Sequence, residues 1–153
     1  MNSPILITGG AQRLGLAIAK HLINQQYEVI ITYRSKKPAL DELIALGAQV
    51  MYADFSDQNG IETAIANIKA RTDSLRAIVH NASDWDQESS DIQPAELLHK
   101  MMQVHASAPY QLNLALEPLL GASSDVADII HMTDYVQAKG SKKHIAYAAS
   151  KAA

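Results

Sequence analysis

Short apolar runs alternate with amphipathic runs along almost the whole chain. The apolar runs predict strands at residues 5–8, 28–33, 49–53, 75–80 and 128–132, and the first of them is typical of a buried parallel strand. Between them, apolar residues three or four positions apart predict helices up to about 24, at 40–46, 60–71 and 94–119, and again from about 145. We expect Leu14, Ile18 and Leu22 to form the inner face of the first helix. Pro109 predicts a kink in the longest one, and residues 133–144 are expected to be irregular.

This repeated strand–helix order predicts an α/β fold, a Rossmann-type doubly wound parallel sheet with helices on both faces. In such sheets ligands bind outside the carboxyl ends of the strands. We therefore expect the polar clusters that follow the five strands to line one crevice. These clusters are residues 8–10, 33–35, 54–55, 81–83 and 133–135.

Composition narrows the class of protein. The 153 residues, 48% of them hydrophobic, suffice for one domain with a core. A net charge of −3 without a basic run does not favour a nucleic-acid partner. The chain has no cysteine, and its six histidines lack the spacing of metal ligands, so we expect no metal. We see no signal peptide and no apolar run long enough for a membrane, so we expect a cytoplasmic protein.

A glycine-rich turn joins the first strand to the first helix. Gly9 and Gly10 end the strand, and Gly15 lies inside the start of the helix. Glycines let the backbone approach a phosphate, and a helix start offers free N–H groups. The second strand ends in Tyr33, Arg34 and Ser35, where an NAD site has an acidic residue. A guanidinium and a hydroxyl suit a ribose 2′-phosphate, so we expect NADPH as cofactor.

The last helix carries Tyr147 and Lys151, which lie four residues apart and so share a helix face. A nearby ammonium favours the phenolate, and we expect it to lower the Tyr147 pKa from about 10. Tyr147 would then give or take a proton near neutral pH.

Together these residues resemble the short-chain dehydrogenase/reductase family. The resemblance rests on Thr8, Gly9 and Gly15, on Asn81-Ala82-Ser83 after the fourth strand, and on Tyr147 and Lys151. It covers the whole chain. Two positions depart from the family pattern: Arg13 replaces its middle glycine, and Asp134 replaces its catalytic serine, thirteen residues before the tyrosine. With Ser83 and Trp85, these departures are similar to the pteridine reductases.

The resemblance implies reduction of a dihydropterin, 7,8-dihydromonapterin or dihydrofolate, with hydride from NADPH and a proton through Tyr147. An ionised Asp134 would repel the developing charge on a ketone oxygen. A ketone or 3-oxoacyl reductase and a non-catalytic NADP-binding chain remain as alternatives. The implied catalytic residues are Asp134, Tyr147 and Lys151, and the implied substrate residues are Arg13, Ser83, Trp85, Asp134 and Tyr147. The implied cofactor residues are Gly9, Arg13, Leu14, Tyr33, Arg34, Ser35, Asp54, Phe55, Asn81, Ala82, Ser83, Tyr147 and Lys151.

Three further expectations follow from the resemblance. Family members are longer, so residues 1–153 are expected to form a single NADP-binding Rossmann-type domain that is truncated after the start of the catalytic helix. The family forms homo-oligomers, and a tetramer is expected. His105 takes the place of a family asparagine on the long helix, where it is either a core histidine or part of a proton relay.

Overall fold

Five parallel strands form one open sheet in the order β3-β2-β1-β4-β5. The computed structural model describes residues 3–89 and 91–153. The strands are β1 (Ile5–Ile7), β2 (Val29–Tyr33), β3 (Gln49–Tyr52), β4 (Ala77–His80) and β5 (Asp128–His131). Each lies within one residue or two of its predicted bounds, and the order confirms the Rossmann-type fold. Strand order reverses beside β1, between β2 and β4, where such sheets bind their ligands.

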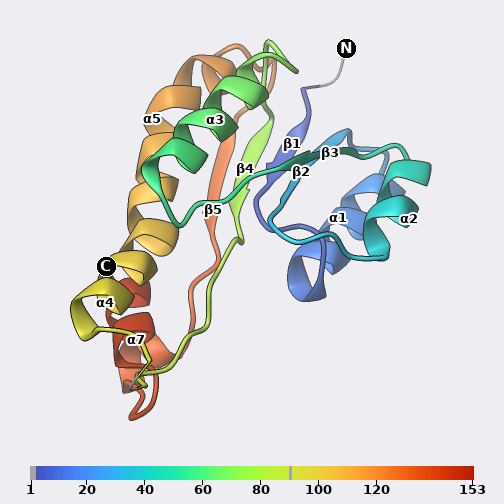
Figure 1. Ribbon diagram of the computed structural model, residues 1–153. Coiled ribbons are helices and arrows are strands. Elements are labelled where there is room, and N and C mark those ends of the chain that lie inside the picture. Colours follow the sequence, from blue (N-terminus) through green and yellow to red (C-terminus); the bar gives the residue numbers. More distant parts are fainter. Residues whose placement is uncertain (1–2, 90) are drawn as a thin grey trace.

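Helices cover both faces of this sheet (Figure 1). On one face lie α1 (Arg13–Asn24) and α2 (Ala39–Ala45), and on the other lie α3 (Gln58–Lys69) and α5 (Ala108–Gly121). Alternate strand residues therefore enter different cores. Leu6 packs in the cluster that includes α3 and α5, whereas Ile5 and Ile7 pack in the cluster that includes α1 and α2. Burial on both faces explains the continuous apolar runs of β1, β2 and β4, whereas β5 is exposed along its length and β3 has one buried residue.

The inner face of α1 differs from its prediction. Gly15 and Ala19 are its buried residues, Ile18 and Leu22 are partly buried, and Leu14 is 52% exposed. Gly15 and Ala19 face the sheet, and their small size lets the helix approach it closely. Leu14 therefore lies at the free start of the helix rather than in the core.

The long predicted helix is interrupted before Pro109. It consists of α4 (Pro94–Met102), a π-helical turn (η1, Gln103–Ser107) and α5. Within η1 and its cap, the Ala108 N–H donates to the Gln103 carbonyl, five residues back. The kink predicted at Pro109 stays a prediction, and Pro109 lies in the first turn of α5, directly after the π-helical turn.

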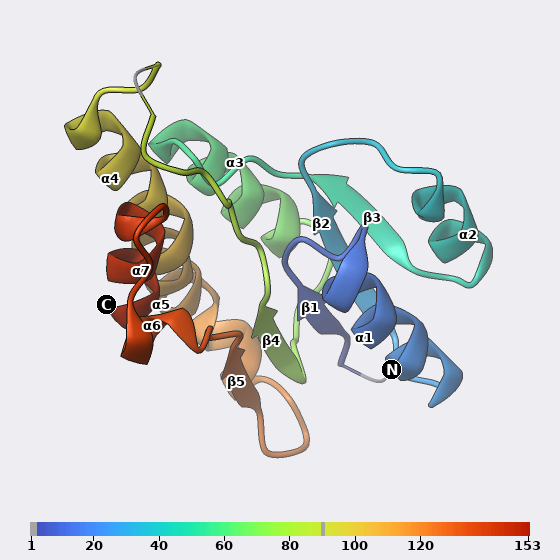
Figure 2. The ribbon, with the colours of Figure 1, turned by 90° about the horizontal axis from the view of Figure 1, so that it is seen from below.

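The segment after β5 is more regular than predicted. It contains the one-turn helix α6 (Val136–Lys139), which begins where the Val136 N–H donates to the Asp134 carboxylate, 2.9 Å away. α7 (Ile145–Ala152) follows and packs against α4, as Figure 2 shows. Among the described residues, no helix combines the length and the apolarity needed to cross a membrane.

Candidate active site

A cavity of about 400 Å³ lies at the carboxyl ends of β1 to β4 and the start of α1. Most of the predicted cofactor residues line it: Gly9, Arg13, Leu14, Tyr33, Arg34, Ser35, Phe55, Asn81, Ala82 and Ser83. Sequence reasoning missed Gln12, Thr32 and Lys37, which line it as well. Arginine and lysine side chains beside a helix start form a donor set that suits the phosphates of a dinucleotide.

A second cavity, of about 310 Å³, adjoins the first and shares Phe55, Ala82 and Val104 with it. The ends of β4 and β5 line it with His80 and Thr133. Lys151 also lines it, from α7. The strand ends are divided between these two adjoining cavities, whereas the sequence predicted one crevice along all five. Asp134, Tyr147 and Trp85 line neither.

The glycine-rich turn is built against the segment after β4. Gly9 has a φ of +68°, and a Cβ there would lie 2.8 Å from the Cα of Ala82. The Asn81 side-chain amide donates to the carbonyls of Thr8 and Gly9, each at 3.0 Å. A Cβ on Gly15 would lie 2.4 Å from that amide nitrogen. Asn81 thus holds the turn in shape, and the free first turn of α1 faces the cavity.

Arg13 occupies the turn in a conformation that favours glycine. Its φ is +50°, and its side chain is exposed and lines the first cavity. A left-handed backbone costs an arginine about 1 kcal/mol or more. The strained turn places this cationic residue in the lining of the first cavity.

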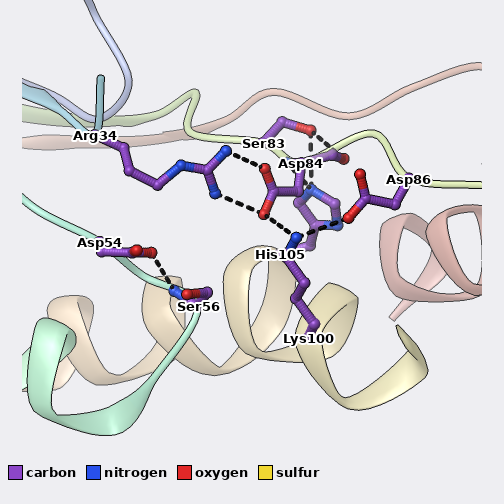
Figure 3. A network of polar contacts seen from close by, with 8 residues as sticks. All are labelled: Arg34, Asp54, Ser56, Ser83, Asp84, Asp86, Lys100 and His105. Atoms are coloured by element: carbon purple, nitrogen blue, oxygen red, sulfur yellow. Dashed lines mark hydrogen bonds and ion pairs between the residues drawn. The ribbon is translucent and has the colours of Figure 1, made fainter. Parts of the chain in front are cut away.

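Arg34 forms a bidentate ion pair that sequence reasoning did not foresee (Figure 3). Its Nη1 lies 2.7 Å from Oδ2 of Asp84, and its Nη2 lies 2.6 Å from Oδ1. The Asp84 side chain is 6% exposed, and Lys100 lies 3.4 Å from it and 2.7 Å from Asp86. Burial raises the pKa of Asp84, but the hydrogen bond and charge of Arg34 outweigh it, so the net pKa is lowered. Asp84 is therefore ionised at neutral pH.

Asp54 does not line either cavity. Its carboxylate accepts from the Ser56 N–H at 2.9 Å, which is the bond of a turn (Figure 3). Its implied role as a cofactor residue stays a prediction.

Tyr147 and Asp134 meet directly. The Tyr147 hydroxyl donates to the Asp134 carboxylate at 2.7 Å, and the same carboxylate accepts from the Val136 N–H. Those two donors lower the pKa of Asp134, so it is ionised at neutral pH. Lys151 donates to the Met132 carbonyl at 3.0 Å, with its Nζ 5.8 Å from the Tyr147 ring centre.

The expected lowering of the Tyr147 pKa is wrong. Burial, followed by the hydrogen bond and charge of Asp134, raises the pKa of Tyr147 to about 12. A carboxylate at hydrogen-bond distance from the hydroxyl favours the neutral phenol more than the more distant ammonium favours the phenolate. Tyr147 therefore carries its proton at neutral pH and presents it to Asp134.

His105 points inward and uses both ring nitrogens. Its Nε2 accepts from the Asp84 N–H at 3.2 Å and lies 2.9 Å from the Ser83 hydroxyl. Its Nδ1 lies 2.8 Å from the Ser150 hydroxyl, which itself donates to the Tyr147 carbonyl. The backbone donor assigns the neutral tautomer with the proton on Nδ1. Burial and the charge of Lys151 lower the His105 pKa to about 4, so the ring is neutral. A well-bonded interior histidine fits this geometry.

Trp85 lies beside Tyr147 and is 55% exposed. Its ring stacks on His144 with centres 3.9 Å apart and meets the Tyr147 ring edge-on at 4.5 Å.

Glu88, a few residues after Trp85, was not foreseen from the sequence. Its carboxylate accepts from the N–H groups of Ala146 and Ile145, at 2.7 and 2.8 Å, and so caps the start of α7. One extended segment, 81–89, therefore contacts the glycine turn, Arg34, α4 and α7.

Comparisons with known proteins agree with this geometry. The family model described as "short chain dehydrogenase" matches residues 3–153. A dihydromonapterin reductase from Klebsiella pneumoniae subsp. pneumoniae is 53% identical over 151 residues, 98% of this chain. The chain spans 63% of that relative's length.

Solved structures show the same fold at low identity. Acetoin dehydrogenase YohF from Salmonella typhimurium has a TM-score of 0.86 at 19% identity, covering 99% of this chain and 62% of that one. FolM alternative dihydrofolate reductase 1 from Brucella canis, complexed with NADP, has a TM-score of 0.80 at 24% identity, covering 99% of this chain and 63% of that one. With the matched family model, the glycine turn and the pair of Tyr147 and Lys151, these findings show that the chain belongs to the short-chain dehydrogenase family.

Proposed function

We propose that this protein reduces a dihydropterin to the tetrahydropterin with NADPH. The observation that carries the proposal is the contact between the Tyr147 hydroxyl and the ionised Asp134, where the family pattern has a tyrosine and a serine. The 53% identical relative, whose name is dihydromonapterin reductase, supports 7,8-dihydromonapterin as the substrate. Dihydrofolate, which carries the same ring system, is the second candidate.

Residues 1–153 would act as one NADP-binding domain of the Rossmann type. The start of α1 would hold the pyrophosphate, and Arg34 with Ser35 would hold the ribose 2′-phosphate. Lys37 and Arg13 add positive charge to the same cavity. The other cofactor residues would be Gly9, Leu14, Tyr33, Asp54, Phe55, Asn81, Ala82 and Ser83, with Tyr147 and Lys151 near the nicotinamide ring. NADPH, when bound, supplies the hydride.

The chain's own residues would orient the substrate and provide the proton. Reduction of a ring C=N bond places a hydride on carbon and a proton on nitrogen. Asp134, as a carboxylate, can accept from the N–H donors on a pterin edge, and Tyr147 holds a proton at its hydroxyl for delivery directly or through a water. Trp85 lies next to Tyr147 and is 55% exposed, so its aromatic ring would be available to cover a flat ring. Arg13 and Ser83 would contact the pterin from the cofactor side.

The charge on Asp134 also argues against a ketone as the substrate. A ketone oxygen becomes negative during reduction and needs a donor beside it. Asp134 is ionised, so it offers repulsion instead of a hydrogen bond.

The test is NADPH oxidation, followed by the loss of reduced-nicotinamide absorbance, with 7,8-dihydromonapterin and with a 3-oxoacyl substrate. Because the relative is longer, the chain is assayed alone and fused in frame to the C-terminal part of that relative. We expect turnover of the dihydropterin and none of the 3-oxoacyl substrate. Turnover of the 3-oxoacyl substrate alone would refute the dihydropterin assignment.

We also propose that copies of the chain associate and that the protein works in the cytoplasm. Tyr110 and Leu114, one turn apart on α5, are 65% and 62% exposed, which supports an apolar contact between copies. A tetramer is the expected state, and light scattering during size exclusion measures it. Use of NADPH and a pterin supports the cytoplasmic location, which cell fractionation tests.

A further inference from the structure

The bidentate pair of Arg34 and Asp84 occupies both terminal nitrogens of an arginine that lines the first cavity. Both terminal nitrogens of Arg34 are directed at the Asp84 oxygens (Figure 3). Asp84 itself is buried and does not line the first cavity. Arg34 therefore lines the cavity while both of its terminal nitrogens bond a carboxylate that does not line it.

We propose that Asp84 competes with the ribose 2′-phosphate for Arg34 and so sets the affinity for the phosphorylated dinucleotide. The inference rests on the proposed function, which assigns the 2′-phosphate to Arg34. A phosphate that binds the edge formed by the two terminal nitrogens must displace the carboxylate, because Asp84 already occupies that edge. Asp84 is then a specificity-determining residue rather than a direct ligand.

The surroundings of Asp84 make this exchange feasible. A buried carboxylate cannot be left without a partner, because an uncompensated buried charge is strongly unfavourable. Lys100 lies 3.4 Å from Asp84, is 35% exposed, and is held by Asp86 at 2.7 Å. When Arg34 leaves, Lys100 remains beside Asp84 to balance its charge.

Arg34 has the freedom that the exchange requires. Its side chain is 45% exposed and extends from the end of β2, so it can swing without opening the core. Ser35 and Lys37 line the same cavity and offer donors on the side to which Arg34 would turn. The exchange then moves one side chain and leaves the backbone of segment 81–89 in place.

Calorimetric binding of 2′,5′-ADP and of ADP tests the proposal without any catalysis. In Asp84→Asn we expect 2′,5′-ADP to bind roughly tenfold more tightly, because a charge-assisted contact no longer has to be broken. Binding of ADP, which lacks the 2′-phosphate, should not change. Asp86→Asn is the matched control: it removes a carboxylate that contacts Lys100 but not Arg34, and it should leave both affinities near the wild-type values. In an Arg34→Ala background, Asp84→Asn should give no gain.

The outcomes separate this inference from the proposed function. If the wild-type chain binds 2′,5′-ADP no better than ADP, both the assignment of NADPH and the proposed competition by Asp84 are refuted. If the wild-type preference is present but Asp84→Asn weakens 2′,5′-ADP, or shifts both ligands alike, Asp84 positions Arg34 or supports the fold, and only the competition is refuted. Should Asp84→Asn not fold, Asp84→Ser replaces it. Independently, the ¹³C carboxyl resonance of Asp84 in the wild type should shift on addition of 2′,5′-ADP, and an unchanged resonance would also refute the exchange.

Discussion

The Tyr147 hydroxyl donates a hydrogen bond of 2.7 Å to Asp134, which lies thirteen residues earlier in the chain. The two side chains come from different elements, α7 and the segment that follows β5, and the packing of α7 brings them together. The carboxylate holds the tyrosine in its protonated form, which is the form a proton donor needs. The pair is therefore the centre of the proposed chemistry.

Removal of the Tyr147 hydroxyl should abolish most of the proposed turnover. In Tyr147→Phe we expect the rate of dihydropterin reduction to fall at least about 100-fold, the usual contribution of a positioned proton donor. Calorimetric binding of NADPH should change little. Tyr135→Phe is the matched control, because Tyr135 is 76% exposed and lies one residue from Asp134. Equal losses in both variants would contradict a special role for Tyr147.

The raised Tyr147 pKa predicts a specific loss of stability in alkali. The unfolded chain releases this proton near pH 10, whereas the folded chain holds it until about 12. The stabilisation is complete below the unfolded pKa and is lost as the pH rises through the folded pKa. The free energy of unfolding of the wild type should therefore fall more steeply over this range than that of Tyr147→Phe. Parallel curves for the two proteins would show that Tyr147 has an ordinary pKa.

The strained backbone at Arg13 predicts a gain in stability at the expense of binding. Arg13→Gly should stabilise the fold by up to about 1 kcal/mol, because glycine adopts a positive φ without steric strain. The same variant should bind NADPH more weakly, since it removes a cation from the cavity.

Gln26 offers the matched control for this prediction. It has a φ of +65° just after α1, is exposed, and does not line either cavity. Gln26→Gly should therefore stabilise the fold by a similar amount and leave NADPH binding unchanged. Denaturant unfolding and calorimetry measure the two effects. If NADPH binding falls equally in both variants, Arg13 has no part in the site.

The cap that Glu88 forms on α7 predicts a dependence of stability on acid. Burial raises the pKa of Glu88, but the N–H groups of Ala146 and Ile145 outweigh it, so the net pKa is lowered. Its stabilisation is thus present above the unfolded pKa, about 4.3, and is lost as the pH falls below it. At neutral pH, Glu88→Gln should cost about 1 kcal/mol in urea unfolding, the usual effect of losing a cap. The exposed Glu96, changed to Gln on α4, is the control, and an equal cost there would refute the cap.

The parts of the fold that local pattern encodes were predictable from the sequence. Apolar runs and glycines located the strands and the turn, because these depend on neighbouring residues. The contacts of Asp84 and Glu88 were missed, because Arg34 and Ala146, the residues that they bond, lie at least fifty positions away in the sequence. Neither Asp84 nor Glu88 lies in a periodic segment. The direction of the Tyr147 pKa was misjudged for the same reason: the helix neighbour Lys151 is visible in the sequence, but the depth of burial and the contact with Asp134 are not.

The π-helical turn at Gln103–Ser107 makes the length of the chain itself a determinant of the site. Each residue in a helix advances the direction of its side chains by about 100°. Leu97 and Met101 of α4 pack in one cluster with Ala146 and Tyr147. The wider π-helical turn accommodates one residue more than a regular α-helical turn, and winding the same five residues as a regular α-helix would rotate α4 by nearly that angle about its axis. The surface that seats Tyr147 would then face elsewhere, although no side chain of the site had been altered.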